Sequence, residues 1–456
     1  ACAVALVMAL VPMAQASATA PQKINPGLAA EIEAWSHSDM SSNQWGLEAI
    51  RASAAWRTST GAGTTVAVID TGLDMTHPDL AGQTVSAGYV WQVGTENGQT
   101  VGRLRPATAS PGLVQQLDLI GHGTHVAGVI AGNSNARGIT GVAPGARILP
   151  INLAAALTES TTMSRFATAF TTAIDAAIRD GARVINVSLG GAELELPWQA
   201  LPRSQKERAA LAASRRICAS IERARMAGVI TVVAAGNSAH NGNQRSDPGV
   251  CPAAIEVGAV GPSLHRAYFS NYNSRVDLTA PGAGILSSTP ARPDTPSAPG
   301  IHGYEWLDGT SFAAPHVSGV LALVLARHPA WNADQVISSV YASVTDRGIE
   351  GTDPEFGRGV VDAAVAVDPD HNTAGGAAAV EAYTNDRGEF AFAFNPPSVN
   401  HFADFAVTVV NRNTGSSRTY SLPGDAVSTP AIPPSSWVRL RATTTAGRAF
   451  DAGWFA

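Results

Sequence analysis

Short apolar runs alternate with longer amphipathic stretches between Thr64 and about Pro369. Five of the runs are rich in valine, isoleucine and alanine and show little alternation of apolar and polar positions: 64–70, 146–153, 182–190, 229–237 and 253–260. Strands covered on both faces have this pattern. In the stretch 164–180, Phe166, Phe170, Ile174 and Ile178 recur every four residues, as on the buried side of a helix. The pattern predicts an α/β fold with a mostly parallel sheet and helices on both faces.

The pattern changes after a Gly/Ala-rich stretch at 370–376, which predicts a linker. Strand-like segments then follow one another, separated by Pro, Gly and Asn: 389–396, 402–412, 418–424 and 436–450. Residues 377–456 are therefore predicted to form a small all-β module. It contains no recognisable chemical motif. Trp437 and Trp454 could contact a ligand such as a carbohydrate, although packing in a core is the commoner role of such rings.

The first residues have the form of a secretory signal peptide. An apolar run is followed by small residues in A-x-A order, so that cleavage after Ala16, Ala18 or Ala20 is expected. A membrane anchor is the alternative, but the run is shorter than the ~20 residues that a spanning helix needs. We therefore expect a signal peptide at 1–20, a short leader at 21–40 and a secreted protein, extracellular or periplasmic.

Charge and composition narrow the function classes. The chain has 456 residues, of which 45% are hydrophobic and 14% charged, so it can bury a large core. Its net charge is -6 and its basic residues are scattered, which argues against a nucleic-acid partner or a membrane surface. We expect a monomer.

Two cysteines, Cys218 and Cys251, remain once Cys2 has left with the signal peptide. An even pair in an exported chain favours one disulfide bond, and two free buried thiols are the alternative. No C-x-x-C motif or Cys/His cluster suggests zinc.

Three short segments place a reactive side chain beside glycine at the end of a predicted element. The strand VAVIDTG ends at Asp70, GHGTHVAG carries His122, and GTSFAAPH places Ser311 at the start of a helix. Taken singly, each has an ordinary structural role as a turn, core or N-cap residue. Taken together, they supply the nucleophile, the base and the carboxylate that acyl transfer requires.

A fourth segment, VVAAGNS, ends a buried strand at Asn237. Asparagine at such a place commonly makes a turn. Its amide can also donate a hydrogen bond to the oxyanion that forms when a serine adds to a carbonyl, with the Ser311 N–H as the second donor.

These four segments, in this order, resemble the subtilisin family of serine peptidases over about residues 41–369. The resemblance implies a subtilisin-like three-layer α/β fold and serine endopeptidase activity on proteins or peptides. Asp70 would orient His122, His122 would move the proton, and Ser311 would form the acyl-enzyme. Asn237 would take the oxyanion role, while His125 and His316 would be structural.

The resemblance also implies a substrate groove. Ser188, Leu189 and Gly190 would pair with the extended substrate and line the primary pocket. Ala235 and Gly236 would form the other wall, with Ala234 and the stretch 244–250. Asp247 near the pocket floor would favour a basic P1 residue, and a solvated surface aspartate is the alternative.

A calcium site is a further implication. The loop from Asn133 resembles the strong calcium loop of the family, in which an asparagine and backbone carbonyls meet an aspartate. Here these residues would be Asn135 and Asp79, and oxygen ligands from a flexible loop suit calcium. Asp39 or Ser41 would supply the remaining ligand.

The chain departs from the family pattern in three places. About 20 residues separate Ala20 from Ser41, fewer than a folding prodomain contains. Extra residues occur at 91–112, where they could overhang the groove, and in a long segment that carries Cys218.

A catalytically silent form of the fold, used for binding, is the competing interpretation. The intact set of four residues argues against it. The relative that uses glutamate in place of the histidine is excluded by His122.

Overall fold

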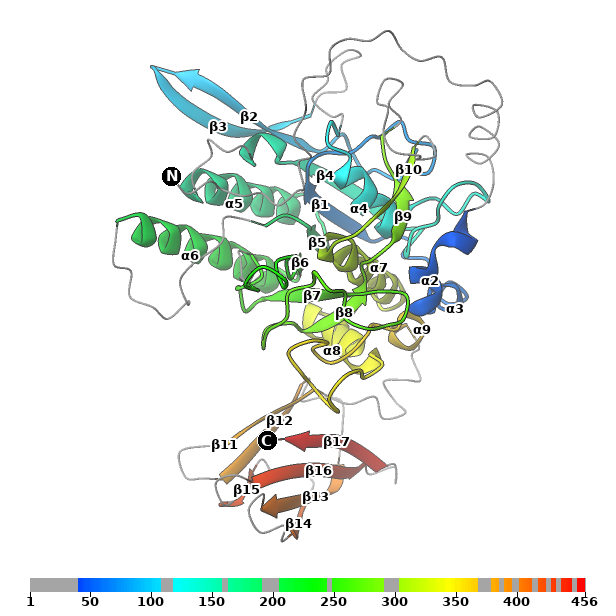
Figure 1. Ribbon diagram of the computed structural model, residues 1–456, viewed down its shortest axis with the longest axis vertical. Coiled ribbons are helices and arrows are strands. Elements are labelled where there is room, and N and C mark those ends of the chain that lie inside the picture. Colours follow the sequence, from blue (N-terminus) through cyan, green and yellow to red (C-terminus); the bar gives the residue numbers. More distant parts are fainter. Residues whose placement is uncertain are drawn as a thin grey trace.

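The computed structural model describes residues 40–107, 118–157, 163–190, 205–243, 248–290 and 303–367, together with strands between 379 and 455. An eight-stranded sheet, ordered β3-β2-β4-β1-β5-β6-β7-β8, runs through the larger part of the molecule (Figure 1). Its strands are β1 (Thr65–Asp70), β2 (Tyr89–Glu96), β3 (Gln99–Pro106), β4 (Arg147–Asn152), β5 (Val184–Val187), β6 (Ile230–Ala234), β7 (Ala254–Val260) and β8 (Leu278–Pro281).

All neighbouring strands of this sheet pair in parallel except β2 and β3, which form an antiparallel hairpin at one edge. The five strands expected from the sequence are β1, β4, β5, β6 and β7. β9 (Ile285–Ser288) and β10 (Tyr304–Leu307) form a separate two-stranded sheet. The mostly parallel α/β fold predicted from the apolar runs is confirmed.

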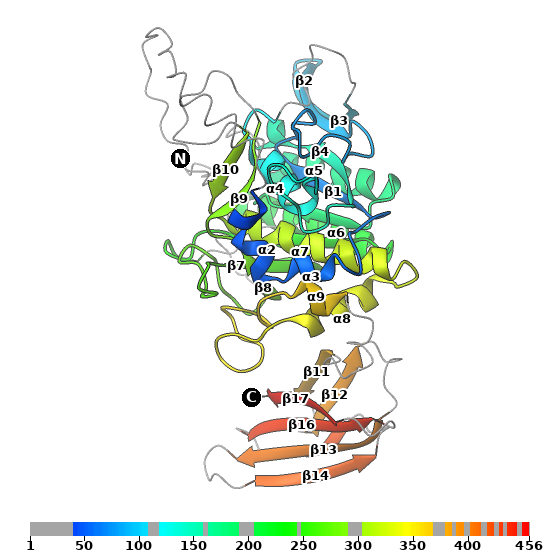
Figure 2. The same cartoon turned by 90° about the vertical axis from the view of Figure 1, so that its right-hand side faces the viewer.

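Helices cover both faces of the sheet (Figures 1 and 2). On one face, α5 (Met163–Arg179) and α6 (Gln205–Met226) bury Phe166, Phe170 and Ile174 in one apolar cluster. On the other, α4 (His122–Ala131), α7 (Thr310–Arg327) and α8 (Ala333–Ser343) share a second cluster. The shorter helices are η1 (Ser41–Asn43), α2 (Trp45–Ala49), α3 (Ala52–Ala55), η2 (Ala154–Ala156) and α9 (Ala363–Ala366).

Helix α7 crosses the interior. Within the described residues it is the one helix long and apolar enough to span a membrane, and 83% of its apolar window is buried inside the protein. Packing against the strands and α4 satisfies its apolar surface, as in the core helix of a folded domain.

The C-terminal strands are all antiparallel and form two sheets, ordered β11-β12-β15 and β14-β13-β16-β17. They lie at the end of the molecule away from the β2–β3 hairpin (Figure 1). The bounds are β11 (Ala379–Thr384), β12 (Glu389–Asn395), β13 (Phe402–Asn411), β14 (Ser417–Pro423), β15 (Ser428–Ala431), β16 (Ser436–Thr444) and β17 (Ala449–Phe455). The expected all-β character of this region is confirmed. The expected signal peptide, leader and linker lie outside the described residues.

Candidate active site

The carboxyl ends of three adjacent parallel strands meet at one edge of the sheet. β1 ends at Asp70, β5 leads into Ser188, and β6 leads into Asn237. In open α/β sheets such an edge is where ligands bind. Helices α4 and α7 begin beside it, with His122 as the first residue of α4 and Ser311 as the second of α7.

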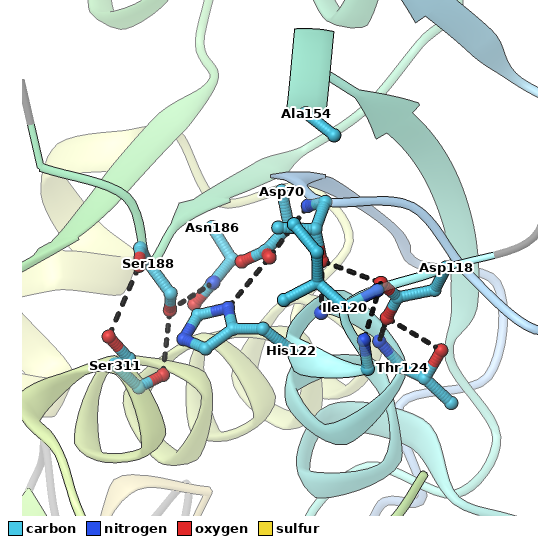
Figure 3. Close-up of polar contacts among 12 residues, drawn as sticks. Asp70, Asp118, Ile120, His122, Thr124, Ala154, Asn186, Ser188 and Ser311 are labelled. Atoms are coloured by element: carbon cyan, nitrogen blue, oxygen red, sulfur yellow. Dashed lines mark hydrogen bonds and ion pairs between the residues drawn. The ribbon is translucent and has the colours of Figure 1, made fainter. Parts of the chain in front are cut away.

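The carboxylate of Asp70 holds the ring of His122. The Asp70 side chain is fully buried, and its Oδ1 lies 2.7 Å from Nδ1 of His122 (Figure 3). Since a carboxylate can only accept, Nδ1 carries the proton and Nε2 is left as an acceptor. Gly121, the residue before His122, has a backbone φ of 94°, which residues other than glycine rarely adopt.

Charge next to the ring decides its protonation. Burial alone would lower the pKa of His122, but the charge of Asp70, the hydrogen bond to Asp70 and the charge of Asp118 outweigh it and raise that pKa above 6.5. The ring is therefore a stronger base than a free histidine. In contrast, burial lowers the pKa of His125 to about 3 and that of His316 to about 4.

Ser311 lies on the side of the His122 ring opposite Asp70 (Figure 3). Its hydroxyl donates to the backbone oxygen of Ser188 at 3.1 Å. In return, the hydroxyl of Ser188 donates to the backbone oxygen of Ser311 at 2.7 Å. Pro315 explains the second bond, because a proline four residues ahead has no N–H for the Ser311 carbonyl. Nothing in the sequence pattern predicts this role of Ser188.

Asn237 is oriented by the first residue of α7. Its Oδ1 accepts hydrogen bonds from the backbone N–H and the hydroxyl of Thr310, both at 2.9 Å. The other end of the amide is its NH₂ group, which can only donate. The Ser311 N–H belongs to the first turn of α7, where backbone N–H groups have no partner within the helix.

The segments expected to line the substrate groove come from neighbouring strands. Ser188, Leu189 and Gly190 follow β5, and Ala235 and Gly236 follow β6, with which β5 pairs. Ser188 and Leu189 are buried, whereas Gly190 is exposed. Asp247, expected near the pocket floor, and Gln244, expected in the other wall, lie outside the described residues.

Cys218 of α6 and Cys251 form a disulfide, with their Cα atoms 5.0 Å apart, so the predicted pairing is confirmed. Cys251 is fully buried and packs in the same apolar cluster as α5 and α6. The bond ties the long α6 to the segment that follows the Asn237 loop.

The surroundings of Asp79, one of the two residues expected to hold calcium, suit that ion. Its carboxylate is fully buried, and Oδ2 accepts from the Ile139 N–H at 2.9 Å and the Tyr304 hydroxyl at 2.8 Å. Oδ1 is buried and makes no hydrogen bond within the described residues. Burial raises the pKa of Asp79, and the hydrogen bonds from Ile139 and Tyr304 partly offset that rise. The Oδ1 atom of Asp79, which has no hydrogen-bond partner within the described residues and lies near the loop that carries Asn135, is a suitable ligand for a hard cation.

No group of three or more His, Cys, Asp or Glu side chains is arranged to hold a metal in the part of the chain that the structure describes. A cation at Asp79 would thus depend on backbone carbonyl and amide oxygens, as calcium permits.

Comparison with known proteins places this arrangement in a class. Residues 61–359 match the Subtilase family. Subtilisin Savinase of Lederbergia lenta is 32% identical over 323 residues, which cover 71% of this chain and 97% of that protein. Fervidolysin of Fervidobacterium pennivorans is 32% identical over 371 residues, and there the chain spans only 48% of the relative's length.

A solved protease of Pseudoalteromonas arctica has the same fold, with a TM-score of 0.54, 29% identity and coverage of 73% of this chain and 98% of that one. An α/β fold that holds a serine, a histidine and a carboxylate at the sheet edge is typical of hydrolases that act through an acyl-enzyme. The chain belongs to the subtilase family and is a subtilisin-like serine peptidase.

Proposed function

We propose that the protein is a secreted serine endopeptidase that cleaves proteins or peptides through an acyl-enzyme on Ser311. The observation that carries the proposal is the 2.7 Å bond between Asp70 and His122 beside Ser311 (Figure 3). The fold alone would permit a binding protein. A base held in one tautomer against a buried carboxylate has a specific use in proton transfer.

In the proposed reaction, the Ser311 hydroxyl turns from the Ser188 carbonyl to Nε2 of His122. His122 takes the proton as Ser311 Oγ bonds to the scissile carbonyl carbon, and Asp70 stabilises the resulting imidazolium. His122 then gives that proton to the leaving amine. In the second half, His122 removes a proton from water as the water oxygen bonds to the acyl carbon. His122 then returns that proton to Ser311 Oγ as the ester bond breaks and the acid leaves.

Two donors would hold the oxyanion of the tetrahedral intermediate: the NH₂ group of Asn237 and the backbone N–H of Ser311. Thr310 fixes Asn237 before the substrate arrives, so no reorientation is needed at the moment of reaction. The helix dipole of α7 adds positive potential at the same place.

The extended segment after β5 would bind the substrate as an added strand, through backbone hydrogen bonds that do not depend on sequence. Gly190 would supply exposed backbone, and Ala235 and Gly236 would form the facing wall. Such binding favours a broad range of protein substrates.

We also propose a structural calcium ion at Asp79 and Asn135. When bound, the ion would supply positive charge to the buried Oδ1 of Asp79 and fix the loop that follows α4. We propose that the protein is exported and that the first 20 residues are removed as its signal peptide. The Cys218–Cys251 disulfide supports export, because such bonds persist in oxidising compartments. Action as a monomer is part of the same proposal.

Hydrolysis of casein and of a peptide library by the purified chain tests the proposal, with Ser311→Ala as the matched control. The wild type should release peptides, and the variant should retain only the small residual rate that binding and the oxyanion donors supply. Equal hydrolysis by both proteins would contradict the role of Ser311. A folded wild type that is inactive with calcium present would favour the binding-protein alternative.

A further inference from the structure

Asp118, which belongs to none of the four sequence motifs, is a buried carboxylate beside the site. It is 1% exposed and lies in the loop before α4 (Figure 3). Its Oδ1 accepts from the Thr71 hydroxyl at 2.8 Å and from the N–H groups of Gly121 at 2.8 Å and Ile120 at 3.2 Å. Its Oδ2 accepts from the N–H of Thr124 at 2.8 Å and its hydroxyl at 2.9 Å. Each of these five groups donates to Asp118, so both of its oxygens serve as acceptors, as in a carboxylate.

These donors flank both members of the catalytic pair. Thr71 directly follows Asp70, and its backbone N–H donates to Oδ1 of Asp70 at 2.7 Å. The Thr71 hydroxyl also accepts from the N–H of Gly123, the residue after His122, at 3.0 Å. One carboxylate therefore links the end of β1 to the first turn of α4.

Asp118 is also a charge that faces His122. Four groups on the elements around the ring of His122 interact with it. These are Asp70 of β1, Asp118 of the preceding loop, His125 of α4 and the uncharged ring of Phe312 of α7. His125, whose pKa burial lowers to about 3, is neutral at any pH at which such an enzyme works. Among the described residues, Asp118 is thus a negative charge that acts on the ring in addition to Asp70.

We propose that Asp118 is a positioning residue of the peptidase reaction: it fixes His122 against Asp70 and stabilises the imidazolium that forms when Ser311 attacks. This inference rests on the function proposed above. Asp118 touches neither the substrate nor the reacting atoms, and it acts through His122.

Asp118→Asn tests the charge with little change in size. The side-chain amide of asparagine replaces one acceptor oxygen of Asp118 by an NH₂ group, which cannot accept from the N–H and hydroxyl groups that face it. We expect kcat/KM to fall about tenfold to a hundredfold, as when a hydrogen-bond partner that orients a metal-bound histidine is removed. The fall should lie in kcat, because the substrate is not touched.

The pH profile separates positioning from a merely structural role. Loss of the negative charge lowers the pKa of His122, so the acid limb of kcat/KM should move toward acid by roughly half a pH unit. Asp118→Glu, which keeps the charge, should leave the limb in place. The control Asp175→Asn removes an exposed carboxylate of α5 that pairs with Arg223 and should change neither value.

All rates are referred to the molecules that a fluorophosphonate labels at Ser311, so misfolded protein does not count. If Asp118→Asn yields no folded protein, Thr71→Val replaces it: kcat should fall while the acid limb stays, because the charge remains. The inference would be overturned if Asp118→Asn kept the wild-type kcat/KM and acid limb. It would also be overturned if Asp118→Asn lowered kcat/KM equally at every pH with the limb fixed, or if Thr71→Val left kcat unchanged. A wild type that is not labelled at all would overturn the proposed function first.

Discussion

The backbone oxygen of Ser311 has an unusual partner, and removing that partner is the most informative single change. Pro315 cannot donate to this oxygen, and the hydroxyl of Ser188 does so at 2.7 Å. The same hydroxyl accepts from Nδ2 of Asn186 at 2.9 Å, and Asn186 in turn accepts from Ser318 of α7 at 2.8 Å. Ser188→Ala removes both bonds of the hydroxyl and adds no new group.

The expected loss follows from the groups left behind. Ser188 is 4% exposed, so little water can replace its hydroxyl, and an unsatisfied donor or acceptor costs about 1–3 kcal/mol. We expect the free energy of unfolding to fall by about 2 kcal/mol. If about 1.4 kcal/mol of that is lost from the placement of Ser311 in the transition state, kcat/KM falls about tenfold.

A double-mutant cycle with Pro315→Ala makes the test specific. Alanine at 315 restores an N–H that can reach the Ser311 oxygen in the ordinary helical manner. Ser188→Ala should therefore cost less in the Pro315→Ala background, with a coupling energy of at least about 0.5 kcal/mol. The measurements are kcat/KM on a peptide substrate and urea unfolding, the latter in a Ser311→Ala background that prevents self-digestion.

Two results would contradict a role of the Ser188 hydroxyl in holding the Ser311 carbonyl. Ser188→Ala with unchanged stability and kcat/KM would mean that the hydroxyl is dispensable. A full-sized loss that Pro315→Ala does not reduce would mean that the loss arises elsewhere than at the Ser311 carbonyl.

Four further outcomes are expected. Asn237→Ala should lower kcat by about a hundredfold with little change in KM, the size known for this donor in subtilisin itself. Since only neutral His122 can take the serine proton and its pKa is raised, kcat/KM should rise with pH through a midpoint above 6.5. Replacing Cys218 and Cys251 by alanine opens a loop with a sequence separation of 33 and should cost about 3.7 kcal/mol of unfolding free energy. Chelation should lower the melting temperature, calcium at about 100 times its Kd should restore about 2.7 kcal/mol, and Asp79→Asn should abolish that dependence.

Much of the fold could be predicted because its signals are local. Buried parallel strands have unbroken apolar runs, and the helical spacing of Phe166 and Phe170 is enough to indicate α5. The β2–β3 hairpin was not predicted, although Asn97 and Gly98 at its turn, with φ of 51° and 75°, are a strong hairpin signal. Its strands alternate poorly because most of the hairpin is exposed.

Some residues of the site could be predicted from the sequence and others could not. Asp70, His122 and Ser311 stand in long motifs, so they could be named from the sequence. Asp118 and the dual bonding of Ser188 could not, because their roles depend on donors and acceptors that come together only when β1, β5 and the starts of α4 and α7 meet. Hydrogen-bond partners far apart in the chain leave no local pattern.

Covalent labelling of the wild type by a fluorophosphonate, followed by peptide mapping in a mass spectrometer, tests directly whether Ser311 is the nucleophile. We expect one modified residue, Ser311, with labelling abolished in Ser311→Ala and strongly slowed in His122→Ala. Labelling at another residue, or none on folded wild-type protein that holds calcium, would contradict the assignment of Ser311 as an activated nucleophile.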